Sequence, residues 1–259
     1  MNFQEVLSLL INNWHIILLF FTIAVLYSSV GFGGGSSYLA VLALTGLAFT
    51  QIRATALFCN IIVVVGNVYF FHRQKTYNYK KVVPLVLFSI PFAFIGGYLK
   101  IHQTLFFVLL GFTLLFAAIS MWISKKIITS EKKSNPPNTI KNASYGGLIG
   151  FISGMVGIGG GIFLAPLLHL TNWDVPKKIA ATASLFILVN SIAGLGGQYL
   201  NPEFTIDWNL TSVLLISVFM GGQIGSRYSN KFLKPVQLKK ATALLIAFVS
   251  IRILWKYLI

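Results

Sequence analysis

Residues 31–44 read GFGGGSSYLAVLAL and residues 154–168 read GMVGIGGGIFLAPLL, so glycines interrupt an apolar segment at two places in the chain. The first motif lies within residues 6–52, a run of 47 residues without a charge. The second lies within residues 142–173, which are also uncharged. A membrane-spanning helix needs about 20 mainly apolar residues, so each run is longer than one crossing requires. The two runs therefore predict membrane helices that are broken at glycines.

Five further uncharged stretches have about the length of one membrane crossing: residues 54–71, 82–99, 101–124, 179–202 and 208–226. A transmembrane β-barrel would show short segments of alternating polarity. Residues 84–95 instead read PLVLFSIPFAFI, in which polar and apolar residues do not alternate. We therefore expect an all-α, polytopic membrane protein.

The composition supports this class and changes the meaning of the charge. The chain of 259 residues has 20 Lys and Arg against 5 Asp and Glu, a net charge of +15, yet only 10% of it is charged and its mean hydropathy is +0.80. Soluble domains carry about 25% charged residues, more than twice the share found here, so an ordinary soluble enzyme is not expected. A disordered chain is not expected either, because disorder requires low hydrophobicity. A net charge of +15 would suggest nucleic-acid binding only if the basic residues lay on a water-facing surface. Because the basic residues lie between apolar runs, the expected partner is a lipid bilayer and not nucleic acid.

The glycine motifs belong to an internal repeat. GFGGG at residues 31–35 matches GIGGG at residues 157–161, and RATAL from Arg53 matches AATAS from Ala180 at nearly the same offset. Gly96-Gly97 and Gly221-Gly222 continue the match further along both halves. The order and the spacing of three markers agree, so we expect two repeats, residues 1–124 and 142–259, joined by a polar cytoplasmic connector, 125–141.

Each repeat is predicted to contain five helical segments. These are residues 8–30, 35–48, 53–71, 82–99 and 102–124, and then 142–156, 161–171, 178–199, 208–226 and 237–258. Residues 161–171 are too short to cross a bilayer about 30 Å thick at about 1.5 Å per residue. The segments after the glycine motifs are therefore half-helices, tilted helices or re-entrant segments.

The basic residues predict the orientation, because cytoplasmic loops are enriched in Lys and Arg. If the second repeat is inverted relative to the first, 16 of the 20 basic residues lie in cytoplasmic loops, at 73–81, 125–141, 177–178 and 227–240. Parallel repeats would give a split of about 11 to 9. We therefore expect inverted structural repeats with both termini outside.

The glycine motifs do not fit nucleotide binding, because no GK[ST] follows them and no acidic residue lies about 20 positions on. In a membrane, broken helices free backbone N–H groups, and helix N-termini that meet near the midplane favour an anion. The alternative is that the glycines only allow close helix packing. The predicted anion cradle consists of Gly31, Gly33, Gly34, Gly35 and Ser36, with Gly157, Gly159, Gly160 and Gly161.

Polar side chains downstream of the motifs are the remaining candidates for anion contact. The hydroxyls of Thr55, Thr182 and Ser184 either donate to an anion or bond back to their own helix. The amides of Asn60 and Asn190 either contact substrate or bond across helices. Arg53 begins a long apolar segment, where it either holds an anion in a bidentate pair or extends to the lipid headgroups.

The paired motifs resemble those of the TauE/SafE sulfite exporter family, also called the toluene sulfonate uptake permease family. The second repeat is the closer match, with GMVGIGGGIFLAPLL followed by KKIAATASLFILVNSIAG at residues 177–194, and the first repeat lacks the proline that Pro166 supplies. The resemblance covers nearly the whole chain. It implies a transporter of small anions, such as sulfite, thiosulfate or sulfonates, in a bacterial inner membrane.

The leading hypothesis is a secondary transporter of a small, sulfur-containing anion that works by alternating access. No ATP-binding motif is present, so a proton or sodium gradient, or the substrate gradient itself, would drive transport. The alternatives are an anion channel and a membrane scaffold subunit without transport. An enzyme is not expected, since no catalytic pair lies in the apolar segments. The sequence indicates no cofactor and no metal site, and it leaves the oligomeric state open.

Overall fold

The computed structural model of the chain describes residues 3–123, 136, 138–227 and 235–258. Within these residues it is all helical, without strands. The helices are α1 (Phe3–Ser29), α2 (Gly35–Leu42), α3 (Phe49–Arg73), α4 (Tyr79–Tyr98), α5 (Gln103–Ile123), α6 (Thr139–Val156), α7 (Gly161–Leu170), α8 (Pro176–Tyr199), α9 (Trp208–Arg227) and α10 (Pro235–Leu258).

Six of the described helices are long and apolar enough to cross a membrane: α1, α3, α4, α5, α8 and α9. Each predicted segment corresponds to one helix, and most bounds agree within a few residues. The predicted all-α, polytopic fold is therefore confirmed. The largest difference is α2, which ends at Leu42 and not near residue 48, because a turn with Gly46 at φ +77° follows it.

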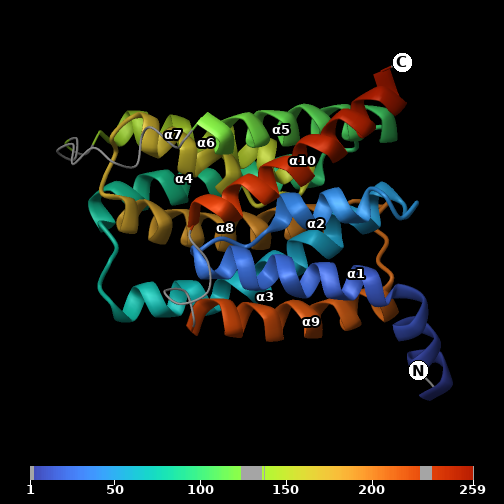
Figure 1. Cartoon of the computed structure of the whole chain (residues 1–259). Coiled ribbons are helices and arrows are strands. Elements are labelled where there is room, and N and C mark those ends of the chain that lie inside the picture. The colour runs from blue at the N-terminus through green and yellow to red at the C-terminus, as the bar shows by residue number, and fades with distance from the viewer. Residues whose placement is uncertain (1–2, 124–135, 137, 228–234, 259) are drawn as a thin grey trace.

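Helices α2 and α7 are too short to cross a bilayer. With 8 and 10 residues, they extend about 12 and 15 Å at about 1.5 Å per residue, against about 30 Å of hydrocarbon. In Figure 1 the ribbon enters the bundle as α1, and α2 then runs back toward the end where the N-terminus lies. The α7–α8 connection lies at the opposite end of the bundle. Each short helix therefore runs only part of the way through the molecule.

The helices of the two halves are interleaved. Helix α9 packs along α1 and α3, while α4 packs along α6 and α8. The helices thus form a first body (α1, α2, α3 and α9) and a second body (α4, α6, α7 and α8), which contact each other mainly where α3 meets α8. Helices α5 and α10 pair with each other, and their buried side chains join the apolar cluster of the first body. The fourth helix of each half therefore belongs to the body of the other half.

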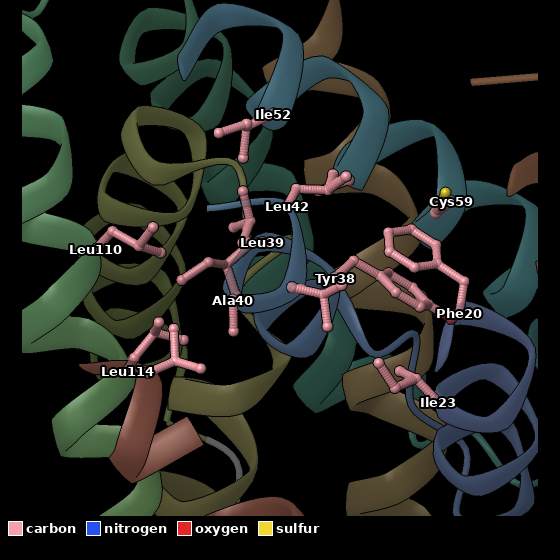
Figure 2. Packing of buried hydrophobic residues seen from close by; sticks show 14 of the residues in the cluster. Phe20, Ile23, Tyr38, Leu39, Ala40, Leu42, Ile52, Cys59, Leu110 and Leu114 are labelled. Carbon is pink, nitrogen blue, oxygen red and sulfur yellow. The ribbon is translucent and has the colours of Figure 1, made fainter. Parts of the chain in front are cut away.

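Helix α2 is buried along its whole length and forms the centre of the larger apolar cluster. Figure 2 shows its side chains between those of α1 and α3 on one side and those of α5 on the other. Tyr38 stacks on Phe20 with 4.7 Å between ring centroids. Leu39 lies toward Leu110, across from the aromatic pair. This packing fixes the direction in which the first residues of α2 point.

A buried ion pair joins the second body at one end of the bundle. The Lys81 Nζ lies 3.5 Å from Asp174 Oδ2, and both side chains are 3% exposed. Lys81 also donates to the Trp173 carbonyl, and the Trp173 indole donates to Asn142 Oδ1 at 2.9 Å. The pair thus links the starts of α4 and α6 to the α7–α8 connection. Neither partner is left as an isolated buried charge, which would be costly.

The connections of the bundle separate into two ends. The α3–α4 and α7–α8 connections lie at one end, and both chain ends and the α8–α9 connection lie at the other (Figure 1). The first end carries the basic residues of 73–81 and 177–178, which were predicted to be cytoplasmic. This arrangement agrees with the predicted orientation, while the inverted symmetry of the repeats stays a prediction.

Candidate functional site

Two glycine loops interrupt the helices where the sequence predicts breaks. The first loop, residues 30–34, joins α1 to α2, and the second loop, residues 157–160, joins α6 to α7. The residues before α2 and α7 are Gly34 at φ +89° and Gly160 at φ +81°, both left-handed. Only glycine adopts this conformation routinely. The chain reversals therefore require glycine at Gly34 in the first triple glycine and at Gly159 and Gly160 in the second.

Each loop presents a helix N-terminus to the interior. The first amides of α2, at Gly35 and Ser36, have no acceptor within their helix, and the same holds for Gly161 at the start of α7. All three residues are buried. A helix N-terminus carries partial positive charge and exposed N–H groups, so this geometry suits an anion.

Asn60 of α3 connects the two loops. Its Nδ2 donates to the carbonyl oxygen of Ile158 in the second loop at 2.9 Å. Its Oδ1 has no hydrogen-bond partner although the side chain is fully buried. A Cβ added to Gly33 or to Gly35 would collide with the Asn60 amide. The two glycine loops therefore approach each other closely enough to share one side chain.

Two buried serines that the sequence analysis did not select lie beside the second loop. A Cβ on Gly159 would lie 2.7 Å from Ser191 Oγ, and a Cβ on Gly160 would lie 3.2 Å from the Ser153 Cβ. Both hydroxyls are buried without a partner. The sequence could have indicated Ser191 as a candidate, because it directly follows Asn190. Ser153 is marked only by its position four residues before Gly157.

Arg53 is buried, at 3% exposed, and does not extend to the membrane surface. It lies in the second turn of α3, and its Nη2 donates to the carbonyls of Gly154 at 3.2 Å and Gly97 at 3.4 Å. A Cβ on Gly157 would lie 3.2 Å from the Arg53 Cβ. The guanidinium therefore caps the end of α6 beside the second loop, and its Nε has no partner.

The other predicted residues have partners within the protein. Thr182 bonds back to the Lys178 carbonyl at 2.8 Å, one of the two roles that the sequence left open. Thr55 Oγ1 lies 3.0 Å from Thr211 Oγ1 on α9. Ser184 donates to the Gly31 carbonyl of the first loop. Asn190 Nδ2 donates to Ser89 Oγ on α4 at 2.9 Å, which is an interhelical bond, although its Oδ1 has no partner.

The structure therefore brings part of the predicted set together. Both glycine motifs, Asn60, Arg53 and Ser184 lie at the two loops. Thr55 and Asn190 make contacts between neighbouring helices instead. The site lies between the two bodies, because α3 belongs to the first body and the second loop to the second.

Comparison with known proteins gives one family and several relatives. The family described as "Sulfite exporter TauE/SafE" matches residues 16–253. A probable membrane transporter protein y4hK of Sinorhizobium fredii is 31% identical, over 91% of this chain and 96% of its own length. A probable membrane transporter protein YjnA of Bacillus subtilis is 28% identical, over 90% and 96%. No solved structure matches the chain.

Proposed function

The chain belongs to the TauE/SafE sulfite exporter family and is a multi-pass membrane transporter, and we propose that it carries a small, sulfur-containing anion by alternating access. Sulfite, thiosulfate and sulfonates are the candidate substrates. The proposed location is the bacterial inner membrane, consistent with the bacterial relatives. The proposed activity is transport, and no enzymatic step is proposed.

One observation carries the proposal: two helix N-termini and four buried side chains with unpartnered polar atoms meet at the contact of the two bodies. These side chains are Arg53, Asn60, Ser153 and Ser191. A buried polar atom without a partner is costly, and native proteins bond nearly all of them. An oxyanion with several acceptor oxygens supplies partners for the hydroxyls and for Arg53 Nε.

The interleaved packing suggests what moves during transport. We infer that the first body and the second body rock against each other around the α3–α8 contact, because the glycine loops lie there. The sequence repeats, residues 1–124 and 142–259, then do not coincide with the moving bodies. Each body contains the fourth helix of the other repeat, α9 in the first body and α4 in the second. A proton or sodium ion, or the substrate gradient, would drive the cycle.

Counterflow of labelled anions into proteoliposomes tests the proposal. We expect saturable uptake of sulfite, thiosulfate or methanesulfonate that is accelerated by unlabelled anion inside. Asn60→Asp should reduce uptake at least tenfold, because it places a negative charge between the loops. The matched control is Asn201→Asp, since Asn201, in the α8–α9 connection, also donates to a distant carbonyl, that of Tyr98 at 3.1 Å, but outside the site.

The alternatives give different results in the same assay. A channel would pass large currents that do not saturate and show no counterflow. A scaffold subunit would show no flux of any anion, and Asn60→Asp would behave like Asn201→Asp. Either result would contradict the proposed carrier.

A further inference from the structure

The two glycine loops have equivalent positions in the repeats but face different side chains of the central helices. A Cβ on Gly33 would contact the Asn60 amide and Val64 Cγ1, both on α3. A Cβ on Gly159, the repeat equivalent of Gly33, would contact Ile187 and Ser191 on α8. Asn60 and Ile187 stand at equivalent positions, as do Val64 and Ser191, so polar and apolar residues are exchanged between the loops.

The exchange places hydrogen-bond donors at the second loop. Only a nitrogen can face the Ile158 carbonyl, so the Asn60 amide is oriented with Nδ2 toward the second loop. A Cβ on Gly159 would lie 2.8 Å from this Nδ2 and 2.7 Å from Ser191 Oγ. The hydroxyls of Ser153 and Ser191 are both buried without a partner, and the Ser153 Cβ would lie 3.2 Å from a Cβ on Gly160, the next residue of the loop. Three side-chain donors therefore surround the second loop.

The first loop offers less to an anion. The Asn60 Oδ1, an acceptor, faces Gly33, and acceptors repel oxyanions. The Asn60 Nδ2 also lies close to Gly35, where an added Cβ would collide with it, but it donates to the Ile158 carbonyl of the second loop. Ser184 already donates to the Gly31 carbonyl, and Val64 has no polar atom. The Tyr38 hydroxyl lacks a partner, but its ring is packed on Phe20 next to Gly34. The first loop thus serves as a packed support for α2.

The buried charges limit the valence of the anion. Among the described residues, two basic side chains are buried, Arg53 and Lys81. Lys81 is paired with Asp174, whereas Arg53 has only carbonyl partners and lies beside Gly157. One guanidinium without a carboxylate balances one negative charge, and a second buried negative charge would lack a counter-charge.

We propose that the anion binds on the second loop alone, between Ser153, Ser191 and the Asn60 Nδ2 beside Arg53, and that it is singly charged. The substrate class is then a sulfonate or hydrogensulfite and not sulfate or thiosulfate. This inference rests on the proposed function, since it assumes that an anion occupies the loops. It replaces a symmetric cradle with a one-sided site, in which the second body supplies its glycine loop, Ser153 and Ser191, and α3 of the first body supplies Asn60 and Arg53.

Ligand-induced thermal stabilisation of the purified protein tests both parts, because a ligand that binds the folded state raises its stability. The probes are methanesulfonate and hydrogensulfite, each with one charge, and sulfate and thiosulfate, each with two. We expect the first pair to raise Tm at concentrations at least tenfold lower than the second. Equal or tighter binding of the doubly charged pair would overturn the assignment of valence.

Ser191→Ala tests the one-sided site against Ser250→Ala, since both hydroxyls belong to fully buried serines on long helices. Ser191→Ala should weaken methanesulfonate binding about tenfold, the effect of a hydrogen bond to a charged group, without lowering the Tm of the free protein. Ser250 donates to the Gly111 carbonyl at 3.1 Å, so Ser250→Ala should lower that Tm and leave anion affinity unchanged.

The failures of the two proposals are distinguishable. If wild type and Ser191→Ala bind methanesulfonate equally, the one-sided site is wrong while anion transport stands. If no anion of either valence binds and counterflow is absent, the proposed function fails, and this inference fails with it.

Discussion

Gly35 is the residue that permits the closest approach between the two glycine loops. A Cβ at this position would lie 2.6 Å from the Ile158 carbonyl oxygen and would also collide with the Asn60 amide. Gly35→Ala should therefore destabilise the protein by about 1–3 kcal/mol, the usual cost of overpacking. It should also abolish anion uptake, because the loops would be pushed apart. Both effects are measurable by denaturation in detergent and by proteoliposome uptake.

Gly66→Ala is the matched control for Gly35→Ala. Gly66 is also helical, but its added Cβ would have only an ordinary contact, at 3.5 Å from Gln223 Nε2. This change should be neutral or stabilise the protein by up to about 1 kcal/mol, because Ala is the better helix former. Equal losses in the two variants would refute the assigned closeness of the loops.

For single residues, the sequence predicts backbone conformation better than it predicts side-chain contacts. The positive φ of Gly34 and Gly160 follows from consecutive glycines in an apolar run. The side chain that each loop faces cannot be predicted in this way. Whether Asn60 faces the first loop and Ser191 the second depends on the rotation of α3 and α8 about their axes. At the offset of Arg53 and Ala180, the equivalent of Asn60 in the second repeat is Ile187 and not the nearby Asn190.

The ion pair at the α7–α8 connection governs how three elements of the second body are held together. Asp174→Asn removes the partner of Lys81, which is buried. Breaking a buried pair by removing one partner typically costs about 3–5 kcal/mol. We expect a loss of this order in unfolding experiments, and a partial rescue in the double variant with Lys81→Met, which no longer leaves a buried charge.

Lys178→Met is the control on the same carboxylate. Lys178 lies 3.9 Å from Asp174 Oδ1, and its side chain is 42% exposed. Pairs of this kind contribute about 0–1 kcal/mol, so the control should lose little stability. A loss as large as that of Asp174→Asn would show that burial of Lys81 is not the cause.

The helices themselves were predictable because each apolar run without charge has a defined length and charged residues at its ends. The bounds of α3 and α8 were predicted within four residues. Hydropathy does not encode partners, so the packing of α4 on α6 was not foreseen. That contact depends on small residues such as Gly154, where a Cβ would collide with the backbone of Ala93.

For the whole molecule, the interleaving of the helices of the two halves limits which parts of the bundle could move as units. Because α9 lies with α1 and α4 lies with α6, neither sequence half can move as a unit without separating from a helix to which it is packed. A conformational change is therefore expected at the smaller contact between α3 and α8. The candidate site lies at this contact, so the proposed anion binding and the proposed movement of the bodies would involve the same residues.

The predicted inversion of the repeats can be tested by the sides of the membrane on which equivalent turns lie. Gln74 follows α3 and Glu203 follows α8, and these two turns are equivalent in the repeats. Inverted repeats place them on opposite faces of the membrane, whereas parallel repeats place them on the same face. Gln74 and Lys177 would both face the cytoplasm, as the basic residues near them indicate.

Single cysteines at these three exposed positions test the arrangement in a Cys59→Ala background, since Cys59 is the only cysteine of the chain. An impermeant maleimide applied to intact cells should label Glu203→Cys and spare Gln74→Cys and Lys177→Cys until the membrane is permeabilised. Labelling of Gln74→Cys and Glu203→Cys from the same face would rule out inverted repeats. The two helix N-termini would then no longer approach a common midplane from opposite sides, and the alternating-access proposal would lose its structural basis.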